Sequence, residues 1–210
     1  MKKFVFLTIL FFIALIAKCG NVFIFEQFDG AFLPSGWSVN GIDESYWYIS
    51  ETNEAGGEPN EIYFYCNNSS TWRIITPTVD LSGLESVTFS FKLGYKKWGT
   101  GMNIGIATTA DNGLHWHQGW MQNINATNVY EITTEISTED IGKQNVRFCI
   151  FFTNTESLNM SDAYVDDISV FVQNNLDIDL QEINVDEVQP NRRLSAENRH
   201  RKRFSFQENY

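Results

Sequence analysis

The sequence is short of positive charge and of catalytic signatures. Its 210 residues hold 15 Lys and Arg against 26 Asp and Glu, which gives a formal net charge of -11. Because phosphate backbones need a basic face, this balance argues against nucleic acid as a partner. No Ser-His-Asp or Cys-His arrangement is signalled, and no pair of carboxylates stands out as the acid and base of a hydrolase. The residues favour a protein that binds over one that catalyses.

Long apolar runs are also lacking, apart from one at the N-terminus. A positive start precedes an apolar stretch, 4–17, which is shorter than the roughly 20 residues of a membrane span. It has the size of a secretory signal region, with the small side chains of Ala17 and Cys19 placed for cleavage. A lipoprotein acylated at Cys19, which Lys18 disfavours, and a retained anchor are the alternatives. We expect residues 1–19 to be a signal peptide, and the mature protein to be secreted or at the cell surface without a membrane span.

Cysteine is equally scarce. If Cys19 leaves with the signal peptide, Cys66 and Cys149 remain and could pair in an oxidising compartment. Strand alternation, however, puts Cys66 on the same face as its apolar neighbours. It puts Cys149 on the face opposite its apolar neighbours. We therefore expect two unpaired thiols, with a disulfide as the alternative.

Helical periodicity is absent, and short strands between turn signals take its place. In 87–93, four apolar residues face one way, and Thr88, Ser90 and Lys92 face the other. Strands are expected at 22–28, 46–50, 61–66, 72–76, 87–93, 103–109, 128–136, 146–152 and 163–172. Many short strands at this spacing predict an all-β fold, a two-sheet antiparallel jelly-roll sandwich.

This β domain is expected to span 20–173, and a different kind of segment follows it. The tail, 174–210, is acidic and then basic, with too few apolar residues for a core, so we expect it to be disordered. Its basic run could be cut by a processing protease after Arg203, although an unprocessed, solvated tail is the favoured alternative.

Five motifs occur in a familiar order along the domain. They are Phe25-Glu26-Gln27-Phe28 with Leu33-Pro34-Ser35-Gly36-Trp37, then 53–59, then Thr76-Pro77-Thr78-Val79-Asp80-Leu81, then 109–116, and finally Tyr164-Val165-Asp166-Asp167-Ile168. In this order they resemble the cleaved-adhesin and choice-of-anchor J jelly-roll domains, and are similar to MAM domains and reelin repeats, although the MAM cysteines are absent. The resemblance implies a galactose-binding-like, MAM-like sandwich, an extracellular location, bound calcium, a role in adhesion or carbohydrate binding, and no catalytic residues.

Four carboxylates are the candidate calcium ligands: Glu26, Asp29, Asp166 and Asp167. The first and last strands of a jelly roll can lie side by side, which would unite residues about 140 positions apart. Calcium takes six to eight oxygens from carboxylates and carbonyls. Adjacent aspartates on a strand face opposite ways, and the resemblance favours Asp166 as the ligand. Surface carboxylates in turns are the alternative.

Residues 109–116 fit the Asp-box pattern Ser/Thr-x-Asp-x-Gly-x-x-Trp. We expect Asp111 to bind the turn backbone, Gly113 to take a positive φ, and Trp116 to pack under the hairpin. A catalytic propeller would need one copy per blade, so a single copy predicts a structural staple.

Aromatic residues make up 15% of the chain. Trp98, in an expected loop, and Trp120 are candidate ligand contacts that could stack on a sugar ring or a partner surface, with core packing as the alternative. Asn68, Asn125 and Asn159 begin Asn-x-Ser/Thr sequons, which would carry glycans in a eukaryotic secretory pathway.

Together these features predict a non-catalytic extracellular adhesion or recognition module with a structural calcium ion. Its expected partner is an extracellular glycan or protein. The alternatives are a secreted glycoside hydrolase, using the glutamates between Glu51 and Glu61, and an accessory module processed at its basic tail.

Overall fold

The computed structural model describes residues 20–40, 46–66, 70–99, 101–153 and 161–173. The expected signal peptide, the tail, and the sequons at Asn68 and Asn159 lie outside these residues and stay predictions. Among the described residues, no helix is long and apolar enough to cross a membrane.

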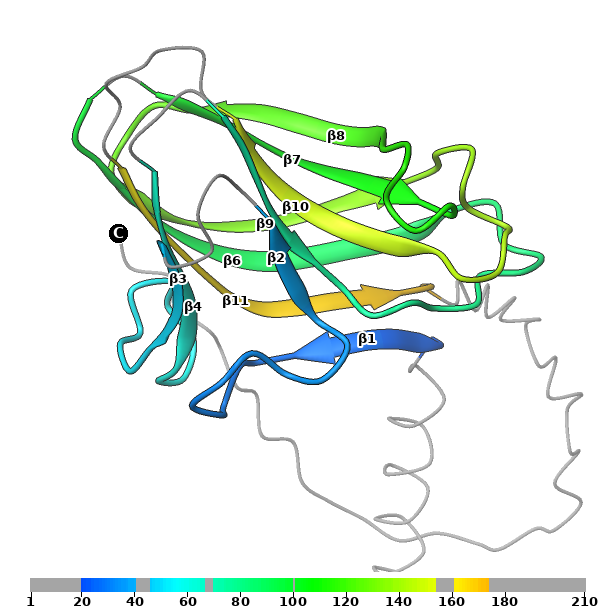
Figure 1. Cartoon of the computed structure of the whole chain (residues 1–210), viewed down its shortest axis with the longest axis horizontal. Coiled ribbons are helices and arrows are strands. Elements are labelled where there is room, and N and C mark those ends of the chain that lie inside the picture. The colour runs from blue at the N-terminus through cyan, green and yellow to red at the C-terminus, as the bar shows by residue number, and fades with distance from the viewer. Residues whose placement is uncertain (1–19, 41–45, 67–69, 100, 154–160, 174–210) are drawn as a thin grey trace, which may run out of the picture. The chain divides into compact units, whose positions relative to one another are not determined.

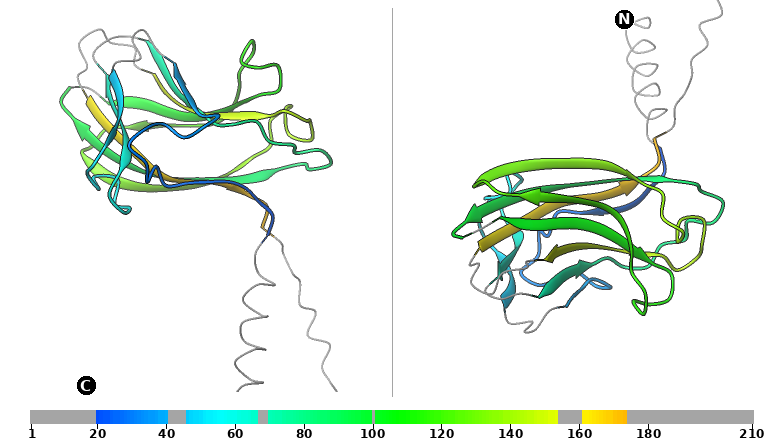
Figure 2. Two further views of the ribbon diagram at one scale, coloured as in Figure 1. Left: turned by 60° about the horizontal axis from the view of Figure 1, so that its bottom comes forward. Right: turned by 90° about the horizontal axis from the view of Figure 1, so that it is seen from above.

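In the described part of the chain, eleven strands form two antiparallel sheets (Figure 1). Sheet A has the order β3-β4-β11-β6-β9, with β1 also paired to β11, and sheet B has the order β2-β5-β10-β7-β8. The strands of sheet A are β1 (Val22–Glu26), β3 (Trp47–Ser50), β4 (Glu61–Cys66), β6 (Val87–Lys97), β9 (Asn128–Ile136) and β11 (Ser161–Phe171). Those of sheet B are β2 (Ser38–Asn40), β5 (Thr71–Ile75), β7 (Met102–Thr109), β8 (His117–Ile124) and β10 (Arg147–Thr153). Figure 2 shows the sheets as two layers, which confirms the all-β jelly-roll sandwich.

Two of the strands were not expected from the sequence. Strand β2 has only three residues, too few to show alternation. Strand β8 is an edge strand of sheet B that carries mostly exposed polar side chains. Both strands form by pairing with a neighbour rather than through an apolar pattern of their own, so period-two reasoning misses them.

The core fills the space between the sheets, as the alternation predicts. In β6, Val87 and its three apolar partners at every second position are buried, whereas the residues between them are not. Aromatic rings meet at one end of this core, where Trp47 stacks on Phe64 with centroids 4.4 Å apart, and Phe64 lies 4.9 Å from Trp72. Full burial of such a side chain contributes about 1.5–3 kcal/mol, so much of the aromatic content stabilises the fold.

Cys149 faces away from this core, as expected, yet it is buried. It belongs to a second apolar cluster on the outer face of sheet B, with Ile75, Ala107 and Phe151, against which Trp116 packs. The thiol is free, and burial raises its pKa to about 12. The thiolate is the reactive form, so burial keeps Cys149 in the less reactive thiol form.

The first and last strands are neighbours, as the jelly-roll prediction requires. Strand β1 pairs with β11 in a register that sets Glu26 opposite Ile168 (Figure 1). A bulge interrupts the pairing of β11 with β6 between Asp166 and Ser169, and Asp167 there has a φ of 51°. This bulge changes the direction of the carboxylates of Asp166 and Asp167.

His117 ties the start of β8 to the segment that precedes β10. Its Nδ1 lies 2.7 Å from Asp140 Oδ2, and its Nε2 lies 2.8 Å from Glu139 Oε1. Asp140 is buried and also accepts a hydrogen bond from Thr108 Oγ1 at 2.8 Å. The hydrogen bond to Asp140 raises the pKa of His117, against the opposing effect of burial. The folded protein therefore favours the imidazolium.

This arrangement predicts how the stability depends on pH. The pKa of His117 is higher in the folded protein than in the unfolded chain. Its contribution to the free energy of unfolding is therefore complete below a pH of about 6.5 and is lost as the pH rises through the folded pKa. We expect His117→Gln to lower the free energy of unfolding at pH 5.5 and to have a smaller effect at pH 9, measured by urea denaturation. When the chain also carries Asp140→Asn, the effect of His117→Gln on the free energy of unfolding should depend less on pH. If the effect of His117→Gln alone is the same at both pH values, the raised pKa of His117 is contradicted.

Candidate functional site

Three tyrosines lie side by side on the outer face of sheet A. Tyr48 of β3 pairs with Tyr63 of β4, and Tyr63 pairs with Tyr164 of β11. The ring centroids are 4.6 Å apart in the first pair and 5.0 Å in the second. We call Tyr48, Tyr63 and Tyr164 the tyrosine row. Because neighbours in an antiparallel sheet point to the same side, the register alone aligns these rings across three strands.

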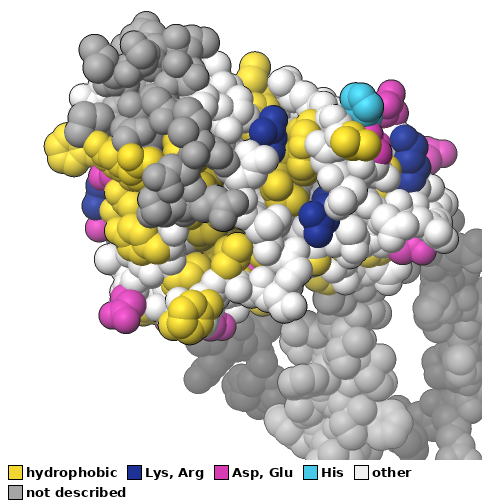
Figure 3. Space-filling view, viewed as in Figure 1, with side chains coloured by type: hydrophobic (Ala, Val, Ile, Leu, Met, Phe, Trp, Pro, Cys, Tyr) yellow, Lys and Arg dark blue, Asp and Glu magenta, His cyan; other side chains and the backbone are white. Residues whose placement is uncertain are grey.

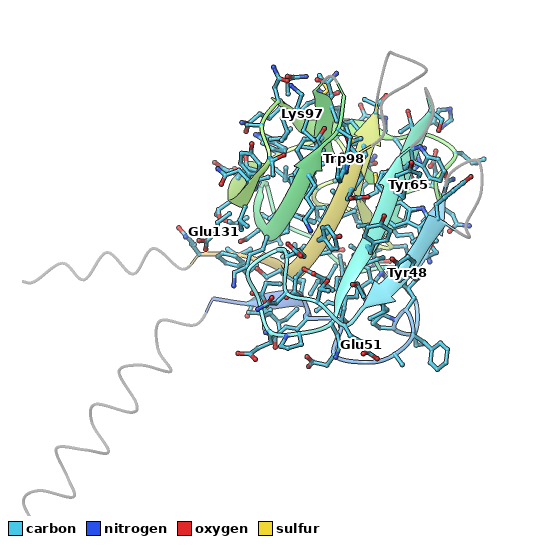
Figure 4. The ribbon with its side chains drawn as sticks, turned by 90° about the vertical axis from the view of Figure 1, so that its left-hand side faces the viewer. Tyr48, Glu51, Tyr65, Lys97, Trp98 and Glu131 are labelled. Atoms are coloured by element: carbon cyan, nitrogen blue, oxygen red, sulfur yellow. The ribbon has the colours of Figure 1, made fainter. Side chains whose placement is uncertain are left out.

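Asp162 connects the tyrosine row to an exposed tryptophan. It accepts a hydrogen bond from the Tyr63 hydroxyl at 2.7 Å and another from Trp98 Nε1 at 3.0 Å. Burial, with the bond to Asp162 next, raises the pKa of Tyr63, so its hydroxyl stays protonated as the donor. Trp98 directly follows β6 and is 70% exposed. Figure 4 looks onto these strands and labels Tyr48, Tyr65 and Trp98.

A hollow adjoins the far end of the tyrosine row. Its volume is about 210 Å³, and Tyr164, Lys96 and Glu54 form part of its lining together with Gly94 and Asn128. Lys96 Nζ lies 5.1 Å from the centroid of Tyr164 and 2.8 Å from Glu54 Oε1. The hollow therefore offers an aromatic wall beside a cation, a carboxylate and an amide, groups that suit a polyhydroxylated ligand.

Residues 51–60, which we call the clasp loop, cross the outer face of sheet A beside this hollow. The fully buried carboxylate of Glu61 holds the loop, because it accepts hydrogen bonds from Thr52 Oγ1 at 2.6 Å and from the backbone N–H groups of Glu54 and Ala55, each at 2.7 Å. A Cβ at Gly94 would collide with the carbonyl of Glu54, so the loop lies directly on β6 only because that residue is glycine. The clasp loop is thus held by Glu61, at the start of β4, and by its close packing on β6 at Gly94.

A second hollow, of about 340 Å³, opens where β2 and β3 approach each other. It is apolar, and Phe32, Val39, Trp47, Tyr48 and Ile49 are among its lining residues. Figure 3 shows hydrophobic side chains gathered on this side of the molecule. Tyr48 contributes to both the hollow and the tyrosine row, so the aromatic surface continues around the edge of sheet A.

Asp166 and Asp167 meet under the clasp loop. A Cβ at Gly57 would collide with Asp166 Oδ2 and would lie 3.4 Å from Asp167 Oδ2, so both carboxylates face the same glycine. The expectation that these adjacent aspartates face opposite ways is wrong, because the bulge with its positive φ at Asp167 breaks the alternation. Asp167 is neutralised by Lys92, whose Nζ lies 2.6 Å from Oδ2, and it accepts a hydrogen bond from Gln27 at 2.9 Å.

Asp166 is the exceptional carboxylate of this cluster. It is 1% exposed, and its Oδ2 has no hydrogen-bond partner. Burial, together with the charges of Asp167 and Glu61, raises the pKa of Asp166 to about 7. A carboxyl group in such a place is either protonated or, when ionised, needs a cation beside it.

The other two expected calcium ligands make hydrogen bonds of their own. Glu26 Oε1 accepts a hydrogen bond from the N–H of Phe28 at 2.8 Å, and the carbonyl of Asp29 accepts one from Asn60 at 3.2 Å. Within the described residues, no three His, Cys, Asp or Glu side chains gather closely enough to hold a metal ion.

The Asp-box residues form a tight hairpin between β7 and β8. Asp111 Oδ1 accepts hydrogen bonds from Thr109 Oγ1 at 2.7 Å and from the N–H of His115 at 3.0 Å. Gly113 has a φ of 89°, and Trp116 packs against the second apolar cluster. These contacts are internal to the hairpin and its base, in keeping with a structural role.

The remaining candidates lie in two different surroundings. Trp120 is partly buried and packs against the main core, unlike Trp98. Asn125 lies in the turn between β8 and β9, where its Oδ1 accepts a hydrogen bond from Lys97 Nζ at 2.7 Å. Tyr48, Tyr63 and Tyr164 were missed as site residues, and Glu61 was considered only among the clustered glutamates of the hydrolase alternative. The outward alternation of Tyr63 within β4 was a usable signal, but nothing in the sequence sets β3, β4 and β11 side by side.

The fold is shared with known binding domains, although no protein-family model and no curated protein sequence matches the chain. A cleaved adhesin domain of Lys-gingipain from Porphyromonas gingivalis is 13% identical, with a TM-score of 0.57 and coverage of 73% of this chain and 99% of that one. The CBM22-1 xylan-binding domain of Xyn10C from Paenibacillus barcinonensis is 11% identical, with a TM-score of 0.55 and coverage of 74% and 97%. TmCBM61, solved with beta-1,4-galactotriose, is 14% identical, with a TM-score of 0.50 and coverage of 70% and 95%. At these identities the likeness is one of fold, and it agrees with the resemblance seen in the sequence.

The contacts of Glu61 predict the effect of removing its charge. In Glu61→Gln, the amide nitrogen would face a backbone N–H of the clasp loop, which leaves donors unpaired. We expect the free energy of unfolding to fall by about 1–3 kcal/mol and a glutamate-specific protease to cut the loop faster. The exposed Glu58→Gln is the matched control and should retain wild-type stability. Equal behaviour of the two variants would show that Glu61 does not hold the loop.

Proposed function

We propose that this protein is a secreted, non-catalytic module that binds carbohydrate through the outer face of sheet A. The observation that carries the proposal is the tyrosine row, aligned by strand register and extended by the exposed Trp98. Aromatic faces stack on the C–H faces of sugar rings, and polar groups at their margins select hydroxyl positions. Asp162, Lys96 and Glu54 stand at these margins. The signal peptide expected from the sequence supports an extracellular ligand.

The state of the carboxylates favours binding over hydrolysis. A glycoside hydrolase needs two carboxyl groups across a cleft, one of them available as an acid. On this face Glu61 is occupied by the clasp loop, Glu54 by Lys96, and Asp162 by Tyr63 and Trp98. These groups hold the surface in place and leave no pair for acid and base catalysis among themselves.

The proposal predicts which side chains glycan binding requires. We expect Tyr63→Ala and Trp98→Ala each to lower the affinity for a glycan found by array screening at least about tenfold, which is about 1.4 kcal/mol. The measurement is isothermal titration calorimetry with the purified protein.

Phe25→Ala is the matched control, because Phe25 is an exposed aromatic residue, 62% accessible, on β1. It should leave the affinity unchanged. If the array finds no ligand, or if the control loses as much affinity as the row variants, the assigned face is wrong.

Calcium is the second part of the proposal, and Asp166 supports it. A divalent cation would stabilise a carboxylate oxygen that is buried, has no hydrogen-bond partner and is subject to the negative charges of Asp167 and Glu61. Asp166 and Asp167 would hold the ion, with backbone carbonyls and water supplying the remaining oxygens. The ion would neutralise charge beneath the clasp loop and so stabilise the loop's contact with the sheet.

Thermal melts test the ion directly. We expect calcium at a hundredfold excess over its Kd to raise the melting temperature by roughly 5–10 °C at pH 7.5, since such binding adds about 2.7 kcal/mol. The increase should be absent in Asp166→Asn and retained in Glu58→Gln. An identical melting temperature in calcium and in chelator would remove calcium from the proposal without affecting the glycan face.

A further inference from the structure

The outer face of sheet B, opposite the tyrosine row, carries both arginines of the described residues. Arg73 lies on β5 and Arg147 on the adjacent β10. Their neighbours Trp72, Ile74 and Phe148 point into the core, so alternation directs both guanidinium groups outward. Arg73 pairs with Phe151, four residues along β10 from Arg147. The two arginines are therefore separated by about 13 Å along the strands.

Neither arginine has an acidic partner among the described residues. Lys92, Lys96 and Lys143 each form an ion pair with a carboxylate, but Arg73 and Arg147 form none. This is unexpected in a chain with 26 acidic and 15 basic residues, because the guanidinium fork matches a carboxylate better than an ammonium does.

Arg147 has a further unsatisfied donor. Its Nε is buried and has no hydrogen-bond partner. A buried donor without an acceptor costs about 1–3 kcal/mol. Because the Nε atom itself is buried, a ligand would meet the remainder of the Arg147 side chain, which is partly exposed.

The surface between the arginines is suited to a sugar ring. Arg73 lies with its guanidinium carbon 5.7 Å from the centroid of Trp116, which packs on the second apolar cluster. In that cluster the ring of Phe151 covers Gly105, where any Cβ would collide with it, but Phe151 is only 9% exposed, so the partly exposed Trp116 is the ring open to a ligand. Asn123 and Asn103, on β8 and β7, add amides at the margin, joined by a hydrogen bond of 3.0 Å.

We propose that the outer face of sheet B binds an acidic glycan, one whose sugar units carry carboxylates. Arg73 and Arg147 pair with carboxylates on separate units of one chain, Trp116 contacts a sugar ring, and the asparagines bind hydroxyls. The net charge of the protein is negative, so long-range attraction does not draw the ligand, and recognition depends on these local contacts. This site is separate from the tyrosine row, and the molecule thereby has a binding face on each sheet.

The test uses oligogalacturonate as the probe, with neutral xylo-oligosaccharide and heparin beside it. We expect the wild-type protein to bind oligogalacturonate in titration calorimetry, and Arg73→Gln and Arg147→Gln each to weaken that binding at least tenfold. Lys97→Gln, the same charge change at the end of β6 in sheet A, should bind as the wild type does. Arg73→Lys keeps the charge but not the planar fork, and should also lose affinity. Unchanged melting temperatures would show that the variants fold.

The outcomes separate this site from the proposed glycan face. Tyr63→Ala and Trp98→Ala should bind oligogalacturonate as the wild type does. This result is expected whether or not the tyrosine row binds a neutral glycan. Three results would each overturn the inference: no binding of oligogalacturonate by the wild type, an equal loss in Lys97→Gln, or equal binding of heparin, which would mark a general polyanion surface.

Discussion

Strand alternation is the constraint on which the rest of the molecule depends. It sends Trp47 into the core and its neighbour Tyr48 to the surface, and it does the same with Phe64 and Tyr63. The aromatic residues that stabilise the sandwich and those proposed to contact a ligand therefore belong to the same strands. A shift in register by one residue would exchange the two sets, so the buried rings fix the position of the exposed ones.

The same constraint makes a departure from it informative. At the bulge in β11, Asp166 and Asp167 turn toward one loop instead of opposite faces. Under that loop Glu61 binds backbone N–H groups, and Asp166 keeps an oxygen without a partner. Bulges are local irregularities of sheets that often redirect a side chain for use. Here the bulge places negative charge where a hydrogen-bonded loop covers it.

Much of the fold could be predicted from the sequence because the interior strands carry a strong alternating pattern. Strand β6 shows this best, since its inward and outward residues were assigned correctly over 87–93. Strands β2 and β8 were missed because edge pairing, not apolar alternation, defines them. The face containing Trp98 was partly foreseen, from its position beside an expected loop. The tyrosine row was not, because its members are distant in sequence and only the order β3-β4-β11 makes them neighbours. The orientation of Asp166 depended on a bulge that no residue pattern announced.

The pairing of the first and last strands also determines where the domain joins the rest of a polypeptide. The N–H of Val172 donates to the carbonyl of Asn21 at 3.0 Å, so the chain enters and leaves at one corner (Figure 2). A unit with adjacent entry and exit points can be inserted into a loop of another protein without stretching its host. The corner occupies the β1–β11 margin, so such tethering would leave the broad surfaces of both layers accessible.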